Sequence, residues 1–166
     1  MQTILGSGGA IGFELAKALK NYTGAIRLVS RNPKKVNPED ELFPADLTRQ
    51  EDVSKAIAGS DIVYLVVGFE YKLKVWQKNW PELMRNVIHA CKEHKSRLVF
   101  FDNVYMYKIS SIPHMTEDAP IHPPSRKGAV RAEISQMIMR EVESGKLEAL
   151  IARAADFIGP EKQPAG

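Results

Sequence analysis

The sequence predicts an α/β fold in which a doubly wound parallel sheet carries helices on both faces. Short apolar runs alternate with longer segments of helical periodicity, which is the pattern of strands joined by crossover helices. The apolar runs are nearly continuous, as expected for strands buried on both faces. A glycine-rich turn joins the first run to the first helical segment, so we expect a ligand site where the strands end.

Composition limits the function classes. The chain has 166 residues, 44% of them hydrophobic and 26% charged, as in one globular domain with a full core. A net charge of +3 indicates neither a nucleic-acid partner nor an anionic membrane surface, and no apolar run approaches the ~18 residues of a membrane span. The single cysteine, Cys91, excludes an intrachain disulfide. Because the glycine turn begins at Gly6 and leaves no room for a targeting peptide, we expect a soluble cytoplasmic protein.

The predicted strands are residues 2–5, 26–30, 42–44, 61–67, 97–102 and 147–152. Apolar stripes mark a first helix and a late helix, at Ile11, Leu15, Ala18 and Leu19 and at Val130, Ile134, Met137, Ile138 and Val142. A third helix is predicted from about Pro81 to His94, with the proline in its first turn. We expect residues 108–125, which hold four of the ten prolines, to form a loop over the sheet edge.

The turn after the first strand has the sequence of a dinucleotide-binding loop, with glycines at GxxGxxG spacing, and reads Gly6-Ser7-Gly8-Gly9-Ala10-Ile11-Gly12. Gly6 would permit the tight turn, Gly9 the approach of a pyrophosphate, and Gly12 the packing of helix on strand. The helix that follows offers unpaired N–H groups to the phosphates. A merely flexible turn is the alternative, but the strand before it and the helix after it favour a nucleotide. A P-loop is disfavoured because no Lys-Ser/Thr pair follows the last glycine.

The end of the second predicted strand indicates which dinucleotide is preferred. Arg31, after Ser30, stands where a fold that prefers NAD usually places an acidic residue. A guanidinium and a hydroxyl suit the ribose 2′-phosphate of NADP, so we expect NADP to be preferred, with NAD as the alternative. The competing interpretation is that residues 31–35 form a solvated basic loop.

Further motifs follow in a fixed order: Ala45-Asp46-Leu47, Val66-Val67-Gly68, Asn86 in a helix, residues 100–107 at a strand end, and residues 153–160. In this order the chain resembles, over almost its whole length, the extended short-chain dehydrogenase/reductase superfamily, in its NAD-dependent epimerase/dehydratase branch. The resemblance implies a Rossmann-like fold that binds NAD(P). It also implies that Asp46 and Leu47 contact adenine and that Val67 and Gly68 form a small-residue turn over the cofactor.

The resemblance fails at the catalytic residues. Members of the superfamily transfer hydride with a Ser/Thr, a Tyr and a Lys, the last two spaced YxxxK, but here the Ser/Thr position is Asn103 and no tyrosine follows Tyr107. One register places Lys127 at the tyrosine and Arg131 at the lysine. The other keeps Lys127 as the ribose-binding lysine and puts Pro123 at the tyrosine.

We expect Lys127 to act as general acid/base, because a like charge one helical turn away disfavours its ammonium form. Arg131 would then hold ribose or a substrate carboxylate. Tyr105 is a second candidate proton donor. The competing interpretation is that Lys127 and Arg131 merely begin a solvated helix.

The resemblance implies a cofactor domain at residues 1–160 and, at 161–166, the start of a connection to a substrate domain that is missing from this chain. We expect the chain to be a fragment of a longer protein; the alternative is a module without a substrate lid of its own. The expected function is an NAD(P)-dependent oxidoreductase or epimerase/dehydratase acting on a hydroxyl or carbonyl, such as that of a sugar nucleotide. The alternatives are a non-catalytic NADP-sensing module and a scaffold that binds a protein. The resemblance also implies a homodimer.

Other residues carry no predicted site. We expect no metal, since His89 and His94 are five residues apart on a helix and point to different faces. Trp76 and Trp80 share one helical face, which favours packing or a subunit contact over stacking on bases. Cys91 is expected to be inert core.

Overall fold

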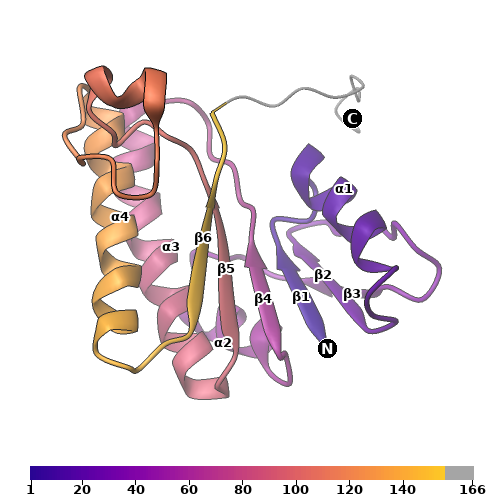
Figure 1. The fold of residues 1–166 in the computed structure, drawn as a ribbon. Coiled ribbons are helices and arrows are strands. Elements are labelled where there is room, and N and C mark those ends of the chain that lie inside the picture. Colours follow the sequence, from indigo (N-terminus) through magenta and orange to yellow (C-terminus); the bar gives the residue numbers. More distant parts are fainter. Residues whose placement is uncertain (156–166) are drawn as a thin grey trace.

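The computed structural model describes residues 1–155, and the predicted connection at 161–166 lies outside the described residues. Figure 1 shows a single sheet with helices packed on it. The strands are β1 (Gln2–Leu5), β2 (Ile26–Ser30), β3 (Glu41–Pro44), β4 (Ile62–Leu65), β5 (Arg97–Asp102) and β6 (Ala149–Arg153). The helices are α1 (Ala10–Leu19), α2 (Gln50–Ile57), α3 (Leu73–His94), α4 (Arg126–Glu143) and the 3₁₀ helix η1 (Ile109–His114). None of these helices is long and apolar enough to cross a membrane.

The six strands are all parallel and lie in the order β3-β2-β1-β4-β5-β6. β1 is central, because Gln2–Leu5 pairs with Ile26–Val29 on one side and with Ile62–Leu65 on the other. The strand order reverses between β1 and β4, and α1 and α3, which follow these two strands, pack on opposite faces of the sheet. In doubly wound folds this reversal point at the carboxyl edge is where ligands bind. The structure therefore has the predicted Rossmann-like class.

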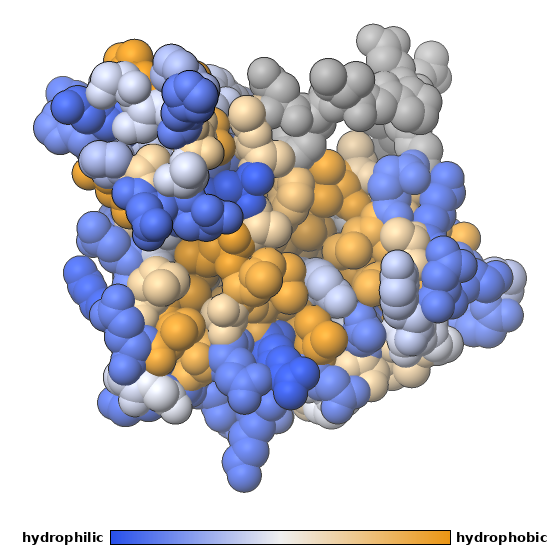
Figure 2. All heavy atoms as spheres, in the orientation of Figure 1, coloured by the Kyte–Doolittle hydropathy of each residue, from blue (hydrophilic) through white to orange (hydrophobic). Residues whose placement is uncertain are grey.

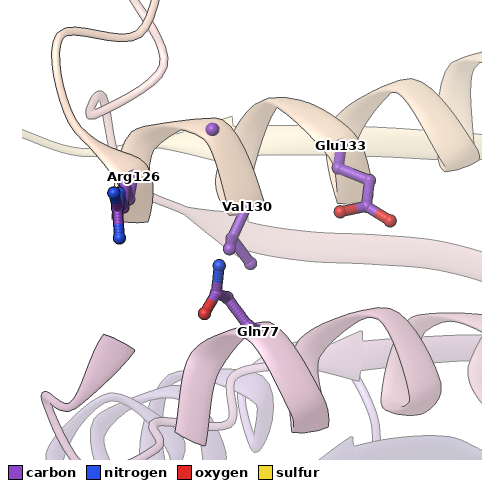
Figure 3. Close-up of a pocket in the computed structure, with 5 residues that line it drawn as sticks. Gln77, Arg126, Val130 and Glu133 are labelled. Carbon is purple, nitrogen blue, oxygen red and sulfur yellow. The ribbon is translucent and has the colours of Figure 1, made fainter. Parts of the chain in front are cut away.

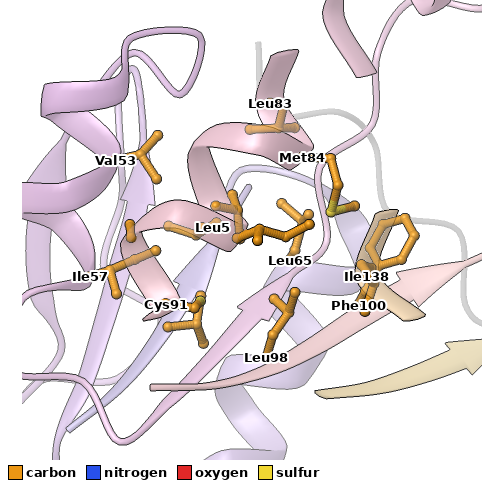
Figure 4. Close-up of a cluster of buried hydrophobic side chains, with 14 of the residues drawn as sticks. Leu5, Val53, Ile57, Leu65, Leu83, Met84, Cys91, Leu98, Phe100 and Ile138 are labelled. Atoms are coloured by element: carbon orange, nitrogen blue, oxygen red, sulfur yellow. The ribbon is translucent and has the colours of Figure 1, made fainter. Parts of the chain in front are cut away.

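Helices α2, α3 and α4 cover one face of the sheet, whereas α1 lies on the other face beside β1 and β2 (Figure 1). The larger core fills the space under α2, α3 and α4; Figure 4 labels its main members, Leu5, Val53, Ile57, Leu65, Leu83, Met84, Cys91, Leu98, Phe100 and Ile138. A smaller cluster under α1 contains Ile4, Ala16, Leu19, Ile26 and Leu28. Apolar residues gather in a hollow on the face drawn in Figure 2.

The structure corrects the predicted start of the third helix. α3 begins at Leu73, so Pro81 lies inside the helix and not in its first turn. Proline has no N–H, and the Gln77 carbonyl therefore loses its usual helical partner. Burial of Trp76 and Trp80, which are 5% and 2% exposed, outweighs this loss, since a fully buried large side chain contributes roughly 1.5–3 kcal/mol.

Several smaller boundaries also differ from the prediction. α2 was not predicted, because only Val53, Ala56 and Ile57 of its eight residues are buried. β4 and β6 are shorter or shifted relative to residues 61–67 and 147–152. In α1, Ala18 is exposed, and Gly12 and Ala16 take part in the buried face instead, because the helix packs through its small residues.

Candidate functional site

The glycine turn after β1 is a tight, backbone-defined structure. The N–H groups of Gly6 and Ser7 both donate to the Val29 carbonyl, at 2.9 and 3.1 Å. Gly6 has φ +95°, and a Cβ there would lie 2.8 Å from the backbone of Val67. A Cβ at Gly12 would lie 2.8 Å from the Gly6 carbonyl oxygen. Side chains at these two positions would therefore force the turn, the helix and the loop after β4 apart.

The other side of the turn is open. A Cβ at Gly8 would have only the Ser30 hydroxyl within reach, at 4.0 Å, and Gly8, Gly9 and Ala10 are exposed while Ile11 is half-buried. No side chain caps α1 at Gly9. The buried Ser7 hydroxyl has no hydrogen-bond partner among the described residues. An uncapped helix start, exposed glycines and an orphaned hydroxyl fit the pyrophosphate of a dinucleotide, which Ser7 and residues 8–12 would hold.

The ends of β2 and β3 lie beside this turn. The Ala45 N–H donates to the Ser30 carbonyl at 3.0 Å, which sets the loop after β3 against the end of β2. Asp46 accepts hydrogen bonds from the Thr48 N–H and hydroxyl at 3.0 and 2.8 Å. These bonds lower the pKa of Asp46, and the charge of Arg31 acts in the same direction. The structure thus brings Ser30, Arg31 and Asp46 to one end of the turn.

The remaining predicted cofactor residues line the same edge. Leu47 and Val67 are half-buried and pack on the larger core. A Cβ at Gly68 would meet nothing within 4 Å, so the chain after Val67 is open on that side. Asn86 of α3 donates to the Thr48 carbonyl at 3.1 Å and thereby fixes the loop that carries Asp46.

A buried ion cluster closes the carboxyl end of β5. Asp102 Oδ1 accepts from Arg131 Nε at 2.6 Å and from the Asn103 N–H at 2.8 Å. Arg153 Nε lies 3.7 Å from Asp102 Oδ2. The same guanidinium donates to the Tyr107 hydroxyl at 2.7 Å and to Ser135 Oγ at 2.6 Å. The cluster therefore ties β5, α4 and β6 together.

Burial and neighbouring charges shift the pKa values of this cluster in opposite directions. Burial raises the pKa of the Asp102 carboxyl, and the Arg131 guanidinium opposes that rise. Burial lowers the pKa of Arg131, and Asp102 opposes that change. Because a guanidinium stays protonated in proteins, Asp102 faces two cations at neutral pH.

The four predicted catalytic residues lie near one another, but in two different environments. Arg131 is 3% exposed and lies 4.2 Å from the Trp80 ring centroid, while it pairs with Asp102. Lys127 Nζ donates to the Tyr71 carbonyl at 2.9 Å and lies over the Tyr71 ring. Asp102 compensates the charge of Arg131, which weakens the like-charge repulsion on which the Lys127 prediction depends.

Asn103 and Tyr105 belong to the turn that follows β5. Asn103 Oδ1 accepts from the Tyr105 N–H at 3.1 Å, so this side chain shapes the turn. The Tyr105 ring is 39% exposed and stacks on Trp76, with the ring centroids 6.4 Å apart and the planes at 13°. Tyr71 completes the aromatic group, nearly perpendicular to Tyr105 at 6.5 Å. This arrangement places an aromatic group, Tyr71, Trp76 and Tyr105, at the carboxyl edge of the sheet.

Two residues of this site, Asp102 and Tyr71, were not identified from the sequence. Asp102 ends a buried strand, and a charged residue in that position is a signal that could have identified it. Tyr71 gives no such signal, because its contact with Lys127 joins residues 56 positions apart.

A groove between the two long helices is lined by none of the predicted site residues. This groove of about 460 Å³ lies between α3 and α4, lined by Gln77, Arg126, Ala129, Val130 and Glu133 (Figure 3). It is on the outer helix layer, away from the glycine turn. Within residues 1–155, no group of three or more His, Cys, Asp or Glu side chains is arranged to hold a metal ion.

Comparison with known proteins decides the family. The profile of the NAD-dependent epimerase/dehydratase family matches residues 3–166. The chain belongs to this family. No curated protein matches the sequence.

Solved structures share the fold of this family member. Uronate dehydrogenase from Agrobacterium tumefaciens has a TM-score of 0.79 and 18% identity, over 89% of this chain and 57% of that one. UDP-glucose 4-epimerase from Brucella ovis, solved with NAD, has a TM-score of 0.81 and 15% identity, over 93% of this chain and 53% of that one. UDP-N-acetylglucosamine 4-epimerase from Bacillus cereus has a TM-score of 0.76 and 17% identity, over 92% and 53%. The chain thus spans little more than half the length of these similar structures.

Proposed function

We propose that this chain is the cofactor domain of an NAD(P)-dependent oxidoreductase or epimerase/dehydratase. The glycine turn carries the proposal, because its packed side needs Gly6 and Gly12 and its open side offers exposed glycines, an uncapped helix start and the Ser7 hydroxyl. Family membership supports the same cofactor class. The substrate would be a hydroxyl or carbonyl compound such as a sugar nucleotide. When bound, the nicotinamide would supply the hydride chemistry, and the chain's own residues would hold and orient it.

Thermal shift with NAD⁺, NADP⁺ and their reduced forms tests cofactor binding. A ligand present at ~100 times its Kd stabilises the native state by about 2.7 kcal/mol, so binding is visible as a rise in Tm. Gly12→Ala is the matched variant that should abolish the rise. The absence of any shift with the wild-type chain would support the scaffold alternative instead.

We further propose that NADP is the preferred dinucleotide. Arg31 follows β2 beside Ser30, and its charge reaches Asp46 on the neighbouring loop. Arg31→Asp should shift the ratio of affinities towards NAD, because a carboxylate repels a 2′-phosphate and accepts from a ribose hydroxyl. Lys34→Asp makes the same charge change three residues further along the same loop and serves as the control. Equal effects of the two substitutions would mean that the basic loop acts only through its overall charge.

A second candidate function is an NADP-sensing module without catalysis, which the absence of a tyrosine after Tyr107 favours. Loss of NADPH absorbance across a panel of carbonyl compounds distinguishes enzyme from sensor. Lys127→Ala tests the general acid/base role of that lysine within the enzyme hypothesis. Unchanged turnover in this variant would leave Lys127 as a structural contact of Tyr71.

A cytoplasmic homodimer is the form that we propose, with the dimer taken from the family resemblance. Sedimentation at several protein concentrations measures the oligomeric state directly, and fractionation of cells that express the tagged chain tests the compartment.

A further inference from the structure

The chain contains five tyrosines, and their contacts differ. Tyr22 is 82% exposed and lies between α1 and the amino end of β2, on the edge opposite the glycine turn. Tyr64 donates its hydroxyl to Gln2 Oε1 at 2.8 Å within the sheet. Tyr107 is 4% exposed, and its hydroxyl accepts from Arg153 at 2.7 Å. Tyr71 and Tyr105 are 63% and 39% exposed, and they follow β4 and β5 at the carboxyl edge of the sheet.

Tyr105 is held in place by three independent contacts. Its N–H donates to Asn103 Oδ1 at 3.1 Å, and its ring stacks on Trp76 at 13°. Its carbonyl touches the first turn of α4 so closely that a Cβ at Gly128 would overlap it. A side chain that must meet a reacting atom repeatedly needs this kind of fixed backbone and fixed ring.

The charges around Tyr105 suit a phenol that gives and takes a proton. The Arg131 guanidinium interacts electrostatically with the Tyr105 phenol, and Arg131 is itself fixed by Asp102. A neighbouring cation stabilises the phenolate that remains after the proton has left. Lys127, by contrast, uses its ammonium to donate to the Tyr71 carbonyl and to cover the Tyr71 ring.

The position in the sheet also favours Tyr105. In a doubly wound fold each half of the sheet takes one nucleotide, and the glycine turn after β1 places the phosphates at the boundary. The end of β2, with Ser30 and Arg31, belongs to the adenosine half. β5 belongs to the other half, so the turn that carries Tyr105 lies where the nicotinamide half would rest.

We propose that Tyr105, at the end of β5, is the proton-transfer residue of this chain in place of the YxxxK tyrosine. The inference rests on the proposed function and names the group that performs its acid/base step. During oxidation the substrate O–H bond breaks and its proton passes to the Tyr105 phenolate oxygen. The carbon-bound hydrogen leaves with its electron pair to the oxidised nicotinamide dinucleotide, and a carbonyl forms. Reduction reverses both transfers.

Three tyrosine variants and one chemical probe test the proposal. Tyr105→Phe keeps the stacked ring and removes only the hydroxyl, so its Tm and its dinucleotide affinity should match the wild type. With any compound of the carbonyl panel that the wild type reduces, its kcat should fall by about 10²–10⁴-fold, which is the usual size of general acid/base catalysis. Tyr22→Phe is the remote control and should retain wild-type kcat, whereas Tyr71→Phe tests the rival phenol and should lower kcat much less than Tyr105→Phe does.

Nitration by tetranitromethane, mapped by mass spectrometry, gives a second readout without turnover. Bound NADP⁺ should protect Tyr105 from nitration while Tyr22 stays reactive. Retained turnover in Tyr105→Phe, loss in Tyr71→Phe instead, or nitration of Tyr105 unchanged by a dinucleotide that binds, would each overturn the assignment. If no dinucleotide shifts the Tm or protects any tyrosine, the proposed function itself fails and the assignment falls with it.

Discussion

Asp102→Asn should be more destabilising than removal of either of its arginine partners. The Asp102 side chain has no exposed surface, and Arg131 and Arg153 side chains are 4% and 19% exposed. The asparagine would leave two guanidiniums facing each other without an anion. Removing one member of a buried pair costs about 3–5 kcal/mol because the remaining charge stays buried.

Arg131→Met should lower the free energy of unfolding by less than Asp102→Asn does, because Asp102 keeps two of its partners. Asp102 would still face Arg153 Nε at 3.7 Å and would still accept from the Asn103 N–H. Methionine also fills the space beside Trp80. The cluster of Asp102, Arg131 and Arg153 therefore predicts which substitution is the more destabilising, as well as how large each loss of stability is.

Urea unfolding at neutral pH, followed by circular dichroism and by tryptophan fluorescence, measures the free energy of unfolding of both variants. Thermal unfolding measures their Tm. For a chain of this size each kcal/mol corresponds to about 2–4 °C in Tm, so Asp102→Asn should lower the Tm by roughly 6–20 °C. The double variant should cost less than the sum of the single ones, because they share one interaction. The reasoning would be refuted if Asp102→Asn lowered the free energy of unfolding by less than about 1 kcal/mol, as for an exposed pair. It would also be refuted if Arg131→Met lowered the free energy of unfolding by more than Asp102→Asn does.

Three further predictions concern the glycine turn, the thiol and acid stability. Gly12→Ala should destabilise the fold by about 1–3 kcal/mol, since its Cβ would lie 2.8 Å from the Gly6 carbonyl; Gly8→Ala, with its nearest atom at 4.0 Å, should leave urea unfolding unchanged. Burial raises the pKa of Cys91 to about 12, so iodoacetamide near pH 8 should label it only after unfolding, and labelling of the native chain would contradict this. The pKa of Asp46 is lowered in the fold, so its stabilisation is present above the unfolded value of ~3.9 and is lost as the pH falls through the folded value. Asp46→Asn should therefore lower the urea midpoint at pH 7 and approach the wild type on acidification; a constant difference would exclude this linkage.

The features predicted correctly from the sequence are those that local patterns encode. Strand positions such as residues 97–102 and the parallel α/β class follow from apolar periodicity, and the structure confirms them. The family resemblance depends on several motifs in a fixed order, and the family match confirms it. The start of α3 was wrong because a local rule about Pro81 competes with burial of Trp76 and Trp80, which only packing reveals. α2 was missed for the related reason that three apolar residues in eight give too little periodicity.

In the candidate site, too, local sequence identified some residues and tertiary structure identified others. Residues 6–12 are contiguous, so this seven-residue segment was enough to place them after β1. The partner of Arg131 lies 29 positions away and the partner of Lys127 lies 56 positions away, and no spacing rule connects such pairs. Tertiary structure alone therefore decided that Arg131 is held by a buried carboxylate, that Lys127 lies over an aromatic ring and that the Tyr105 ring stacks on Trp76. Periodicity acts along the chain, whereas these charges and rings meet because separate crossovers end at the same edge of one sheet.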